Sequence, residues 1–422
     1  MRARYAKLAL TISLVLSSPY TIAGGFQLSE HSAAGIGRAN AGEAAIADSA
    51  AVIANNAAAI TRFNSMQVSI NGAYLAPNVR VTGNGPDEIV NNQLTSNDVV
   101  DHVLVPSIYI VAPINDSWSW GIGIFSDFGA ATEYPDDYLA GSIAGETTLE
   151  TLNVNPNIAY KLNDNFSIGL GVSAVYGQAK LTRTLGILAD ASNVNNGTNF
   201  ERSDTAQSLE GEGVGYGFNA GLLWELNNDH RFGLSYRSNV DIDMEGDYST
   251  FTQPGAIAKG ELTLNLPSIA EFSGFHQISA PFALHYSVVM TGWDVFEEIS
   301  GTVDGQEVLQ KDENFENSFK YALGATYDIS SSLKLRAGIS YDETPNVNDV
   351  SISLPDSNRM SYSAGASYSF NDTNSLDFGF TFVDVEEVTF SEELSSELPG
   401  VSYEFRSKSD VYIYAVQYNL SF

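Results

Sequence analysis

The chain has 422 residues and no cysteine, and its 51 Asp and Glu outnumber its 20 Lys and Arg to give a formal net charge of -31. This surplus of acid excludes nucleic-acid binding as the main function, because too few cations remain to neutralise phosphates. The lack of cysteine excludes a disulfide-stabilised scaffold.

The N-terminus is typical of an export signal. Arg2, Arg4 and Lys7 precede an apolar stretch over 8–16 that is too short to cross a bilayer as a helix. Small residues at 21–23 suit signal peptidase, so we predict a signal peptide over 1–23. No later segment reaches about 18 consecutive apolar residues, so no transmembrane helix is expected. A soluble exported protein and a closed β-barrel remain.

Residues 24–63 are rich in alanine and small polar residues and lack any alternation of period two. Their low charge and apolar content disfavour the alternative of a disordered periplasmic tail. We therefore predict a compact plug over 24–63, lying inside a transmembrane β-barrel that is formed by 64–422.

The rest of the chain alternates apolar and small or polar residues, as a lipid-facing strand requires. The period of two predicts about fourteen antiparallel strands. Their expected positions are 66–79, 102–114, 117–128, 146–162, 165–186, 207–226, 230–249, 259–275, 279–303, 316–329, 332–345, 358–370, 374–390 and 405–422. An even number of strands places both termini of the chain on the periplasmic side.

Turns of two lengths join these strands. Short polar turns such as 115–117, 163–165 and 371–373 alternate with long segments such as 129–145 and 187–206. Short periplasmic turns and long external loops are the pattern of the outer membrane of a Gram-negative bacterium. Acidic residues in the long segments either bind divalent cations between lipopolysaccharide groups or simply keep the loops solvated.

The final residues carry the clearest alternation. One face holds Tyr412, Tyr414, Val416, Tyr418, Leu420 and Phe422. This face resembles a lipid-facing strand with an aromatic girdle, and the aromatic last residue resembles the terminal signal of outer-membrane barrels. We therefore predict an all-β, monomeric, multi-pass outer-membrane protein, because a closed barrel needs no partner subunit.

Several segments resemble one family in particular. They are Gly24-Gly25-Phe26-Gln27-Leu28, Gly35-Ile36-Gly37-Arg38-Ala39, Gly42 to Asp48, Phe128 to Tyr134 and Leu262 to Pro267. Together they resemble the long-chain fatty-acid outer-membrane transporters, the FadL family, over Gly24 to Phe422. One position departs from the family pattern, because Asn56-Ala57-Ala58 stands where the family usually has Asn-Pro-Ala, and the lost proline should loosen that turn.

The resemblance implies a fourteen-stranded barrel, a hydrophobic pocket and passive passage of long-chain fatty acids, with lateral exit through a gap at a kinked third strand. The alternative is uptake of other hydrophobic compounds, such as aromatic hydrocarbons. The expected partners are the hydrophobic ligand, outer-membrane lipid and lipopolysaccharide. An open porin and an adhesin are the rivals from other classes.

Three residues are candidates for substrate binding. In register with the strand that starts at 165, odd positions face inward, so Arg183 points into the upper barrel. Lys311 precedes the predicted tenth strand, and by resemblance both cations hold the fatty-acid carboxylate. The alternative for them is ion pairing with inward acids such as Asp241 or Glu245. By resemblance Phe26 reaches into the inner pocket and binds substrate there. The alternative is that Phe26 is only a core residue of the plug.

Glycines mark the expected exit. Gly121, Gly123 and Gly129 lie in and after the third strand, where glycine permits kinks and bulges, so they are candidates for gating and lateral exit. Glycine is nevertheless common on every predicted inward face. The five histidines show no metal spacing and no Gly-x-Ser-x-Gly motif is present, so we expect no metal, no cofactor and no enzymatic activity.

Overall fold

The structure is a computed structural model that describes residues 25–253, 255–346, 349–394 and 400–422. The predicted signal peptide, 1–23, lies outside the described residues. Within the described ranges, no helix is both long and apolar enough to cross a membrane.

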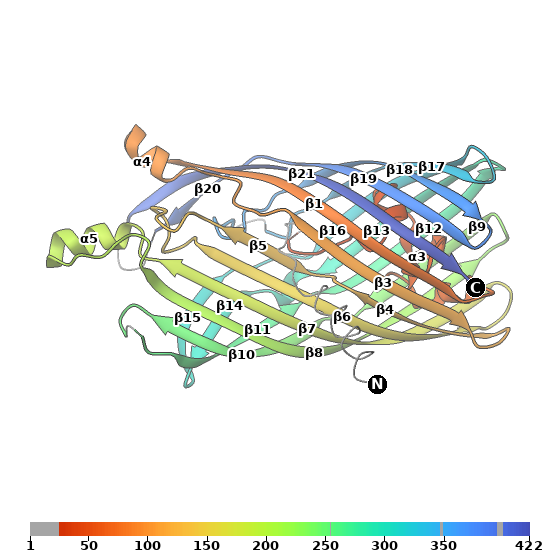
Figure 1. The fold of residues 1–422 in the computed structure, drawn as a ribbon, viewed down its shortest axis with the longest axis horizontal. Coiled ribbons are helices and arrows are strands. Elements are labelled where there is room, and N and C mark those ends of the chain that lie inside the picture. Colours follow the sequence, from red (N-terminus) through yellow and green to blue (C-terminus); the bar gives the residue numbers. More distant parts are fainter. Residues whose placement is uncertain (1–24, 254, 347–348, 395–399) are drawn as a thin grey trace, which may run out of the picture.

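Strands make up most of the described chain (Figure 1). They are β1 (Gln67–Asn84), β2 (Ser96–Asn97), β3 (Val103–Pro113), β4 (Trp118–Phe125), β5 (Gly129–Glu133), β6 (Glu146–Lys161), β7 (Phe166–Thr184), β8 (Thr205–Glu225), β9 (His230–Arg237), β10 (Val240–Thr250), β11 (Ala258–Leu266), β12 (Ser268–Ser279), β13 (Phe282–Gly292), β14 (Glu298–Val303), β15 (Gln306–Asp312), β16 (Ser318–Asp328), β17 (Leu333–Asp342), β18 (Arg359–Asn371), β19 (Asn374–Val385), β20 (Val388–Glu393) and β21 (Ser402–Ser421). The helices are α2 (Ala33–Ile36), α3 (Glu43–Ile46), η1 (Ala50–Ala54), η2 (Ala57–Arg62), α4 (Glu88–Gln93), α5 (Ile187–Asn196) and η3 (Trp293–Val295).

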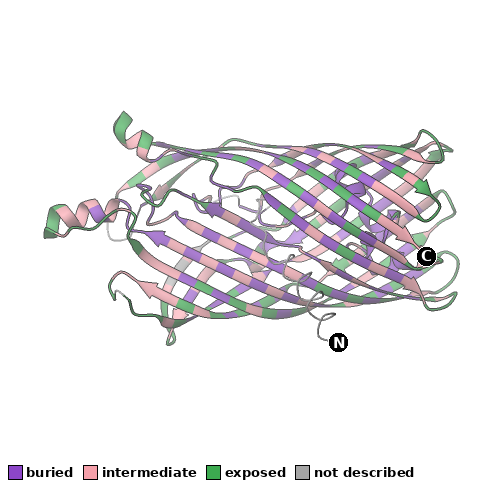
Figure 2. Cartoon of the chain, viewed as in Figure 1, coloured by how far each residue is buried: buried purple, intermediate pink, exposed green. Residues whose placement is uncertain are grey.

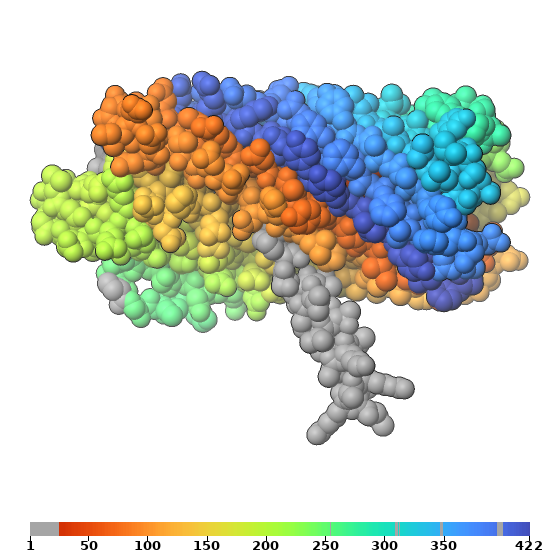
Figure 3. All heavy atoms as spheres, turned by 45° about the horizontal axis from the view of Figure 1, so that its top comes forward, coloured from red at the N-terminus to blue at the C-terminus, as the bar shows by residue number. Residues whose placement is uncertain are grey.

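Over the described ranges, the strand segments form fourteen antiparallel crossings of the barrel wall, each made of one strand or of consecutive strand segments, and we call each crossing a stave. The staves close into a barrel, which confirms the predicted fold. The closing seam joins β1 to β21, from the pair of Gln67 and Ser421 to the pair of Asn84 and Glu404. Figure 3 shows this seam as orange β1 against blue β21. Closure matters because a free sheet edge cannot satisfy its backbone groups in lipid.

The two ends of the barrel differ as predicted. Short turns join the staves at the end that carries the C-terminus, and α4 and α5 project at the opposite end (Figure 1). Several staves extend well beyond the roughly ten residues that span a bilayer, so the end with α4 and α5 stands above the membrane.

Buried and exposed residues alternate along the strands of the wall (Figure 2). On β21, Tyr412, Tyr414 and Val416 are 40%, 49% and 48% exposed, whereas Ile413 and Ala415 are 6% and 3% exposed. The aromatic and apolar face therefore points outward, toward lipid. The same period holds on β7 and β8, and it places the odd-numbered Arg183 inside the barrel, where it is buried.

One stave changes face part-way. Between β9 and β10 the consecutive residues Arg237 and Ser238 both turn inward, which shifts the alternation by one residue. Asp241 and Glu245 on β10 are consequently exposed on the outer face. The prediction that these acids face inward, as partners for Arg183 or Lys311, is wrong for this reason.

The helices α2, α3, η1 and η2 lie inside the barrel (Figure 1). Inward glycines let the wall approach them closely. An added Cβ at Gly233 on β9 would lie 2.0 Å from the carbonyl oxygen of Ala44, and one at Gly169 on β7 would lie 2.3 Å from the nitrogen of Ala58. The small residues of the inward face therefore make room for residues 25–63, which we call the plug.

Charged groups inside the barrel are ion-paired or hydrogen-bonded locally. Arg38 contacts Glu43 at 2.6 Å and Asp48 at 2.8 Å, and Arg231 on β9 donates to the carbonyl oxygens of Ala45 and Ile46. Burying charge is costly unless it is paired or hydrogen-bonded in this way. These contacts therefore hold the plug in one position against the wall.

The turn that lacks the family's proline is nevertheless ordered. Asn56 is the N-cap of η2, and its side-chain oxygen accepts from the Ala58 N–H at 2.9 Å. Its amide nitrogen donates to the Ala44 and Leu222 carbonyls. Ala57 is the first residue of η2, a position where proline needs no change of backbone.

We expect Ala57→Pro to stabilise the protein by about 0.4–1 kcal/mol, because proline at a compatible position lowers the entropy of the unfolded chain. The extended backbone of Asn56 suits a following proline. The measurement is the urea midpoint of the purified protein in a neutral detergent. Ala58→Pro is the control and should destabilise, because it removes the N–H that Asn56 caps. A lower midpoint for Ala57→Pro would contradict this reading.

Candidate functional site

The third stave is interrupted between β4 and β5. Phe125 pairs with Asn153 on β6 and Gly129 pairs with Glu150, so residues 126–128 face only residues 151 and 152. The extra residue makes a bulge, which turns both Asp127 and Phe128 inward, where they are buried. Within the described chain β5 pairs with β6 alone, and its other edge has no partner strand.

The plug takes the place of the missing strand at the bulge. Gln27 and Phe128 form an antiparallel bridge. The Gly129 N–H donates to the Phe26 carbonyl at 2.9 Å, and the Leu28 N–H donates to the Asp127 carbonyl at 2.7 Å. The plug therefore satisfies the Gly129 N–H and the Asp127 carbonyl, while the hydroxyl of Thr151 on β6 donates to the Phe128 carbonyl.

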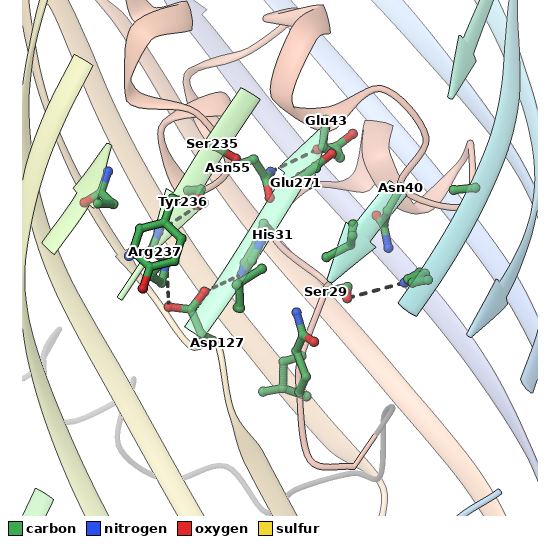
Figure 4. Close-up of a pocket in the computed structure, with 18 residues that line it drawn as sticks. Ser29, His31, Asn40, Glu43, Asn55, Asp127, Ser235, Tyr236, Arg237 and Glu271 are labelled. Atoms are coloured by element: carbon green, nitrogen blue, oxygen red, sulfur yellow. Dashed lines mark hydrogen bonds and ion pairs between the residues drawn. The ribbon is translucent and has the colours of Figure 1, made fainter. Parts of the chain in front are cut away.

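Side chains reinforce this contact (Figure 4). The Asp127 carboxylate lies 3.3 Å from His31 Nε2 and 3.6 Å from Arg237 Nε, and it accepts from the Asn153 amide at 2.9 Å. Arg237 also donates to the Ala54 carbonyl of the plug. We call the contacts of residues 26–31 with 127–129, together with Arg237, the plug latch.

The side chain of Phe26, the first residue of the plug latch, packs in an aromatic cluster. Its ring centroid lies 4.6 Å from that of Trp293, 4.9 Å from that of Phe296 and 6.0 Å from that of Phe128, each in an edge-to-face arrangement. Such pairs add to the free energy of burial of the rings. Phe26 thus anchors the N-terminal end of the described plug in the barrel interior.

Above Phe26 lies an apolar cavity. Its lining includes Phe26, Leu149, Leu181, Leu264, Phe296 and Leu354. Its volume of about 40 Å³ is room for only a few water molecules at about 10–15 Å³ each. An alkyl chain therefore enters this cavity only if a lining side chain moves, and Phe26 is the one that the plug carries.

Arg183 lies at the outer end of this cavity. It follows Leu181 on the inward face of β7, and its guanidinium donates to Thr147, which also lines the cavity, at 3.1 Å. It also donates to the carbonyl oxygens of Glu146 and Thr182. Burial lowers the pKa of Arg183 to about 10, and the group remains a cation at neutral pH.

Lys311 lies on β15, within the tenth stave. Its ammonium donates to the hydroxyls of Ser351 and Ser353, and it lies 3.2 Å from Glu313 Oε1. The carboxylates of Glu313 and Glu392 both interact electrostatically with the cations Lys311 and Arg183. The structure therefore brings the two predicted cations into one region, and it adds acids that the sequence did not single out.

The three candidate glycines take different places. Gly121 and Gly123 both face inward on β4, where an added Cβ would meet the plug residue Ile53 or the ring of Phe125. The wall is continuous there, because β4 pairs with both β3 and β6. Gly129 instead follows the bulge directly and begins β5.

A second, polar cavity is lined in part by residues of the plug latch (Figure 4). His31, Glu43, Asp127, Arg237, Glu271 and Lys320 are among its lining residues. Lys320 and Ser29 also line a neighbouring polar cavity that includes Asp342 and Arg359. Polar cavities of this kind suit water rather than an alkyl chain.

Sequence reasoning missed Asp127, His31, Arg237 and Glu313. For Asp127 a signal existed, because this acid directly follows the alternating stretch of β4 in the register of its inward residues Gly123 and Phe125. His31 and Arg237 lie far from it in sequence, and no local pattern connects them. Glu313 lies just beyond β15 in a segment without alternation.

Comparison with known proteins agrees with the barrel and its interior. The family model for outer membrane protein transport proteins (OMPP1/FadL/TodX) matches residues 14–422. The chain is 37% identical over 447 residues to the long-chain fatty acid transport protein of Escherichia coli O6:H1, covering 99% of both chains.

Two solved structures share the fold. A Pseudomonas aeruginosa FadL homologue superposes with a TM-score of 0.83 at 22% identity, covering 94% of this chain and 100% of its own. The toluene transporter TodX of P. putida gives 0.68 at 14% identity, covering 95% and 98%.

We expect Asp127→Ala to loosen the plug latch. Leaving Arg237 without its carboxylate partner inside the barrel should cost about 3 kcal/mol. The measurement is conductance of the purified protein in planar bilayers, where the variant should open more often than the wild type. Asp116→Ala, at an exposed turn next to β4, is the matched control and should leave conductance unchanged. Equal conductance of Asp127→Ala and wild type would rule out a closing role for the latch.

Proposed function

Since the chain belongs to the family of outer membrane protein transport proteins (OMPP1/FadL/TodX) and is a β-barrel of the outer membrane, we propose that it takes up long-chain fatty acids by passive passage. A family relative carries that function in its name. The observation that carries the proposal is an apolar cavity with two cations next to its lining: Arg183 donates to the lining residue Thr147, and Lys311 donates to Ser353, which precedes the lining residue Leu354.

The cavity and the cations suit the two parts of such a ligand. Each methylene transferred from water to an apolar site contributes about 0.8 kcal/mol, so a long chain gains most of its affinity from the cavity. The carboxylate needs charged hydrogen-bond donors once it leaves water. Arg183 and Lys311 offer them at one end, with Ser351 and Ser353 beside Lys311.

We place the exit at the bulge of the third stave. An alkyl chain that enters the cavity displaces Phe26, and the carbonyl of Phe26 accepts from Gly129 next to the bulge. Movement of Phe26 therefore removes hydrogen bonds that close the wall. A lateral exit keeps the alkyl chain out of water throughout, which a water-filled pore would not do. This reading favours Gly129 over Gly121 and Gly123 as the residue at the exit.

Uptake of neutral hydrophobic compounds is the second candidate, and the aromatic cluster of Phe26, Trp293 and Phe296 favours it. A neutral hydrocarbon has no group to pair with Arg183 and Lys311, which favours the fatty acid. We further infer that the protein works as a monomer surrounded by lipid and lipopolysaccharide, because its barrel closes on itself.

Charge tests the proposed site directly. Arg183→Ala combined with Lys311→Ala should weaken oleate binding by roughly 2–4 kcal/mol, because the buried carboxylate loses its partners. Methyl oleate, which carries no charge, should bind nearly as well as to the wild type. The measurement is binding to the purified protein, alongside growth on oleate of a transporter-deletion strain that expresses each variant.

General damage to the barrel would weaken both ligands together, and heat-modifiable migration in gels checks folding. Lys259→Ala is a matched control, because Lys259 is an exposed cation on β11 that pairs with Asp247. Unchanged oleate binding by the double variant would remove the headgroup role of the two cations. Failure of the wild type to restore growth on oleate would count against fatty-acid uptake itself.

A further inference from the structure

The cation site contains its own counter-ion. Glu313 is fully buried at 0% exposure, and its Oε1 lies 3.2 Å from the ammonium of Lys311. Among the described residues neither carboxylate oxygen of Glu313 has a hydrogen-bond partner of good geometry. A carboxylate held by one ion pair and little else depends strongly on that cation.

The charged groups facing Glu313 come from three other places in the fold. Lys311 lies on β15, Arg183 on β7 and Glu392 on β20. Glu392 accepts from the Ile352 N–H at 2.9 Å, and the hydroxyl of Tyr134 donates to the Ile352 carbonyl at 2.7 Å. When both acids are ionised they balance the two cations, and the site then carries no net charge before any ligand arrives.

An anionic headgroup is therefore a third anion in a balanced, buried site. It competes with Glu313 for Lys311. Keeping two anions ionised in one small buried site costs free energy, because like charges repel and neither is solvated. Glu313 is enclosed and has no solvent to turn toward. A single proton restores the balance, and it resides on the pair formed by Glu313 and the headgroup.

We propose that Glu313 is a specificity-determining residue of the headgroup site, and that an alkyl anion binds there together with one proton. This inference rests on the proposed fatty-acid function of the same site. According to this proposal, the protein takes up one proton with each alkyl anion and does not bind the anion alone.

The chemistry of Glu313 agrees with this role. Burial raises the pKa of its carboxyl, and the neighbouring Lys311 offsets the rise only in part. A bound anion raises that pKa further. Affinity is therefore greatest below the pKa of the free protein, falls as the pH rises between the free and bound values, and is lowest above the bound value.

The test uses a ligand whose own charge is constant. Tetradecane sulfonate stays anionic from about pH 5 to about pH 9, so any pH dependence of its binding arises in the protein. Wild-type affinity should rise as the pH falls, by up to about tenfold per pH unit. Glu313→Gln should bind the sulfonate with one affinity at every pH, near the acid limit of the wild type.

Two controls keep the result specific. Glu307→Gln, an exposed acid on the same hairpin, should keep the wild-type pH dependence. Tetradecanol has no charge and should bind each protein independently of pH. If Glu313→Gln fails to fold, calorimetry of the wild type in buffers of different ionisation enthalpy still measures the proton, which should be taken up with the sulfonate in the pH range where the affinity changes.

The outcomes separate the two proposals. A flat sulfonate affinity in the wild type, or the same slope in Glu313→Gln, overturns the role of Glu313 while leaving fatty-acid binding intact. Proton uptake near zero in calorimetry at every pH from about 5 to about 9 does the same. Failure of the wild type to bind oleate, tetradecanol and the sulfonate alike would overturn both the headgroup site and the proposed function.

Discussion

The rest of this structure depends on one constraint, which is that backbone N–H and C=O groups in a membrane wall must find partners within the protein. Most of the wall meets it by pairing neighbouring strands, and the seam of β1 with β21 closes the ring. At the bulge of the third stave the wall lacks a partner strand, and residues 26–28 of the plug supply the missing bonds to residues 127–129. The integrity of the wall there depends on where the plug lies.

This arrangement couples the ligand cavity to the wall. Phe26 lines the apolar cavity with its side chain and bonds to Gly129 with its carbonyl, so one residue takes part in both. Asp127 connects the same bulge to His31 and Arg237. Separating these buried charges is costly, so the ion pairs stabilise the contact between plug and bulge. These contacts hold the protein in a closed state with a small cavity. To make space for an alkyl chain, the plug and the bulge must move together.

Much of the wall could be predicted from sequence, because a half-lipid-facing strand repeats every two residues. The alternation on β7 placed Arg183 inward correctly, and the outward tyrosines of β21 were also correct. The same reasoning failed for Asp241 and Glu245, because one extra residue between β9 and β10 reverses every later side chain. The plug latch joins segments that are far apart in the sequence, and Glu313 lies outside the strands, so no local alternation predicts either of them.

The most direct measurement of the account uses the absence of native cysteine. Gln27 and Phe128 face each other in an antiparallel bridge, where Cα atoms are about 4.5–5.5 Å apart and a disulfide is possible. In Gln27→Cys/Phe128→Cys, oxidation should abolish oleate uptake and a reductant should restore it, whereas each single variant should ignore both treatments. Uptake by the fully oxidised double variant at the rate of its reduced form would show that ligands pass without any movement of the plug from the wall.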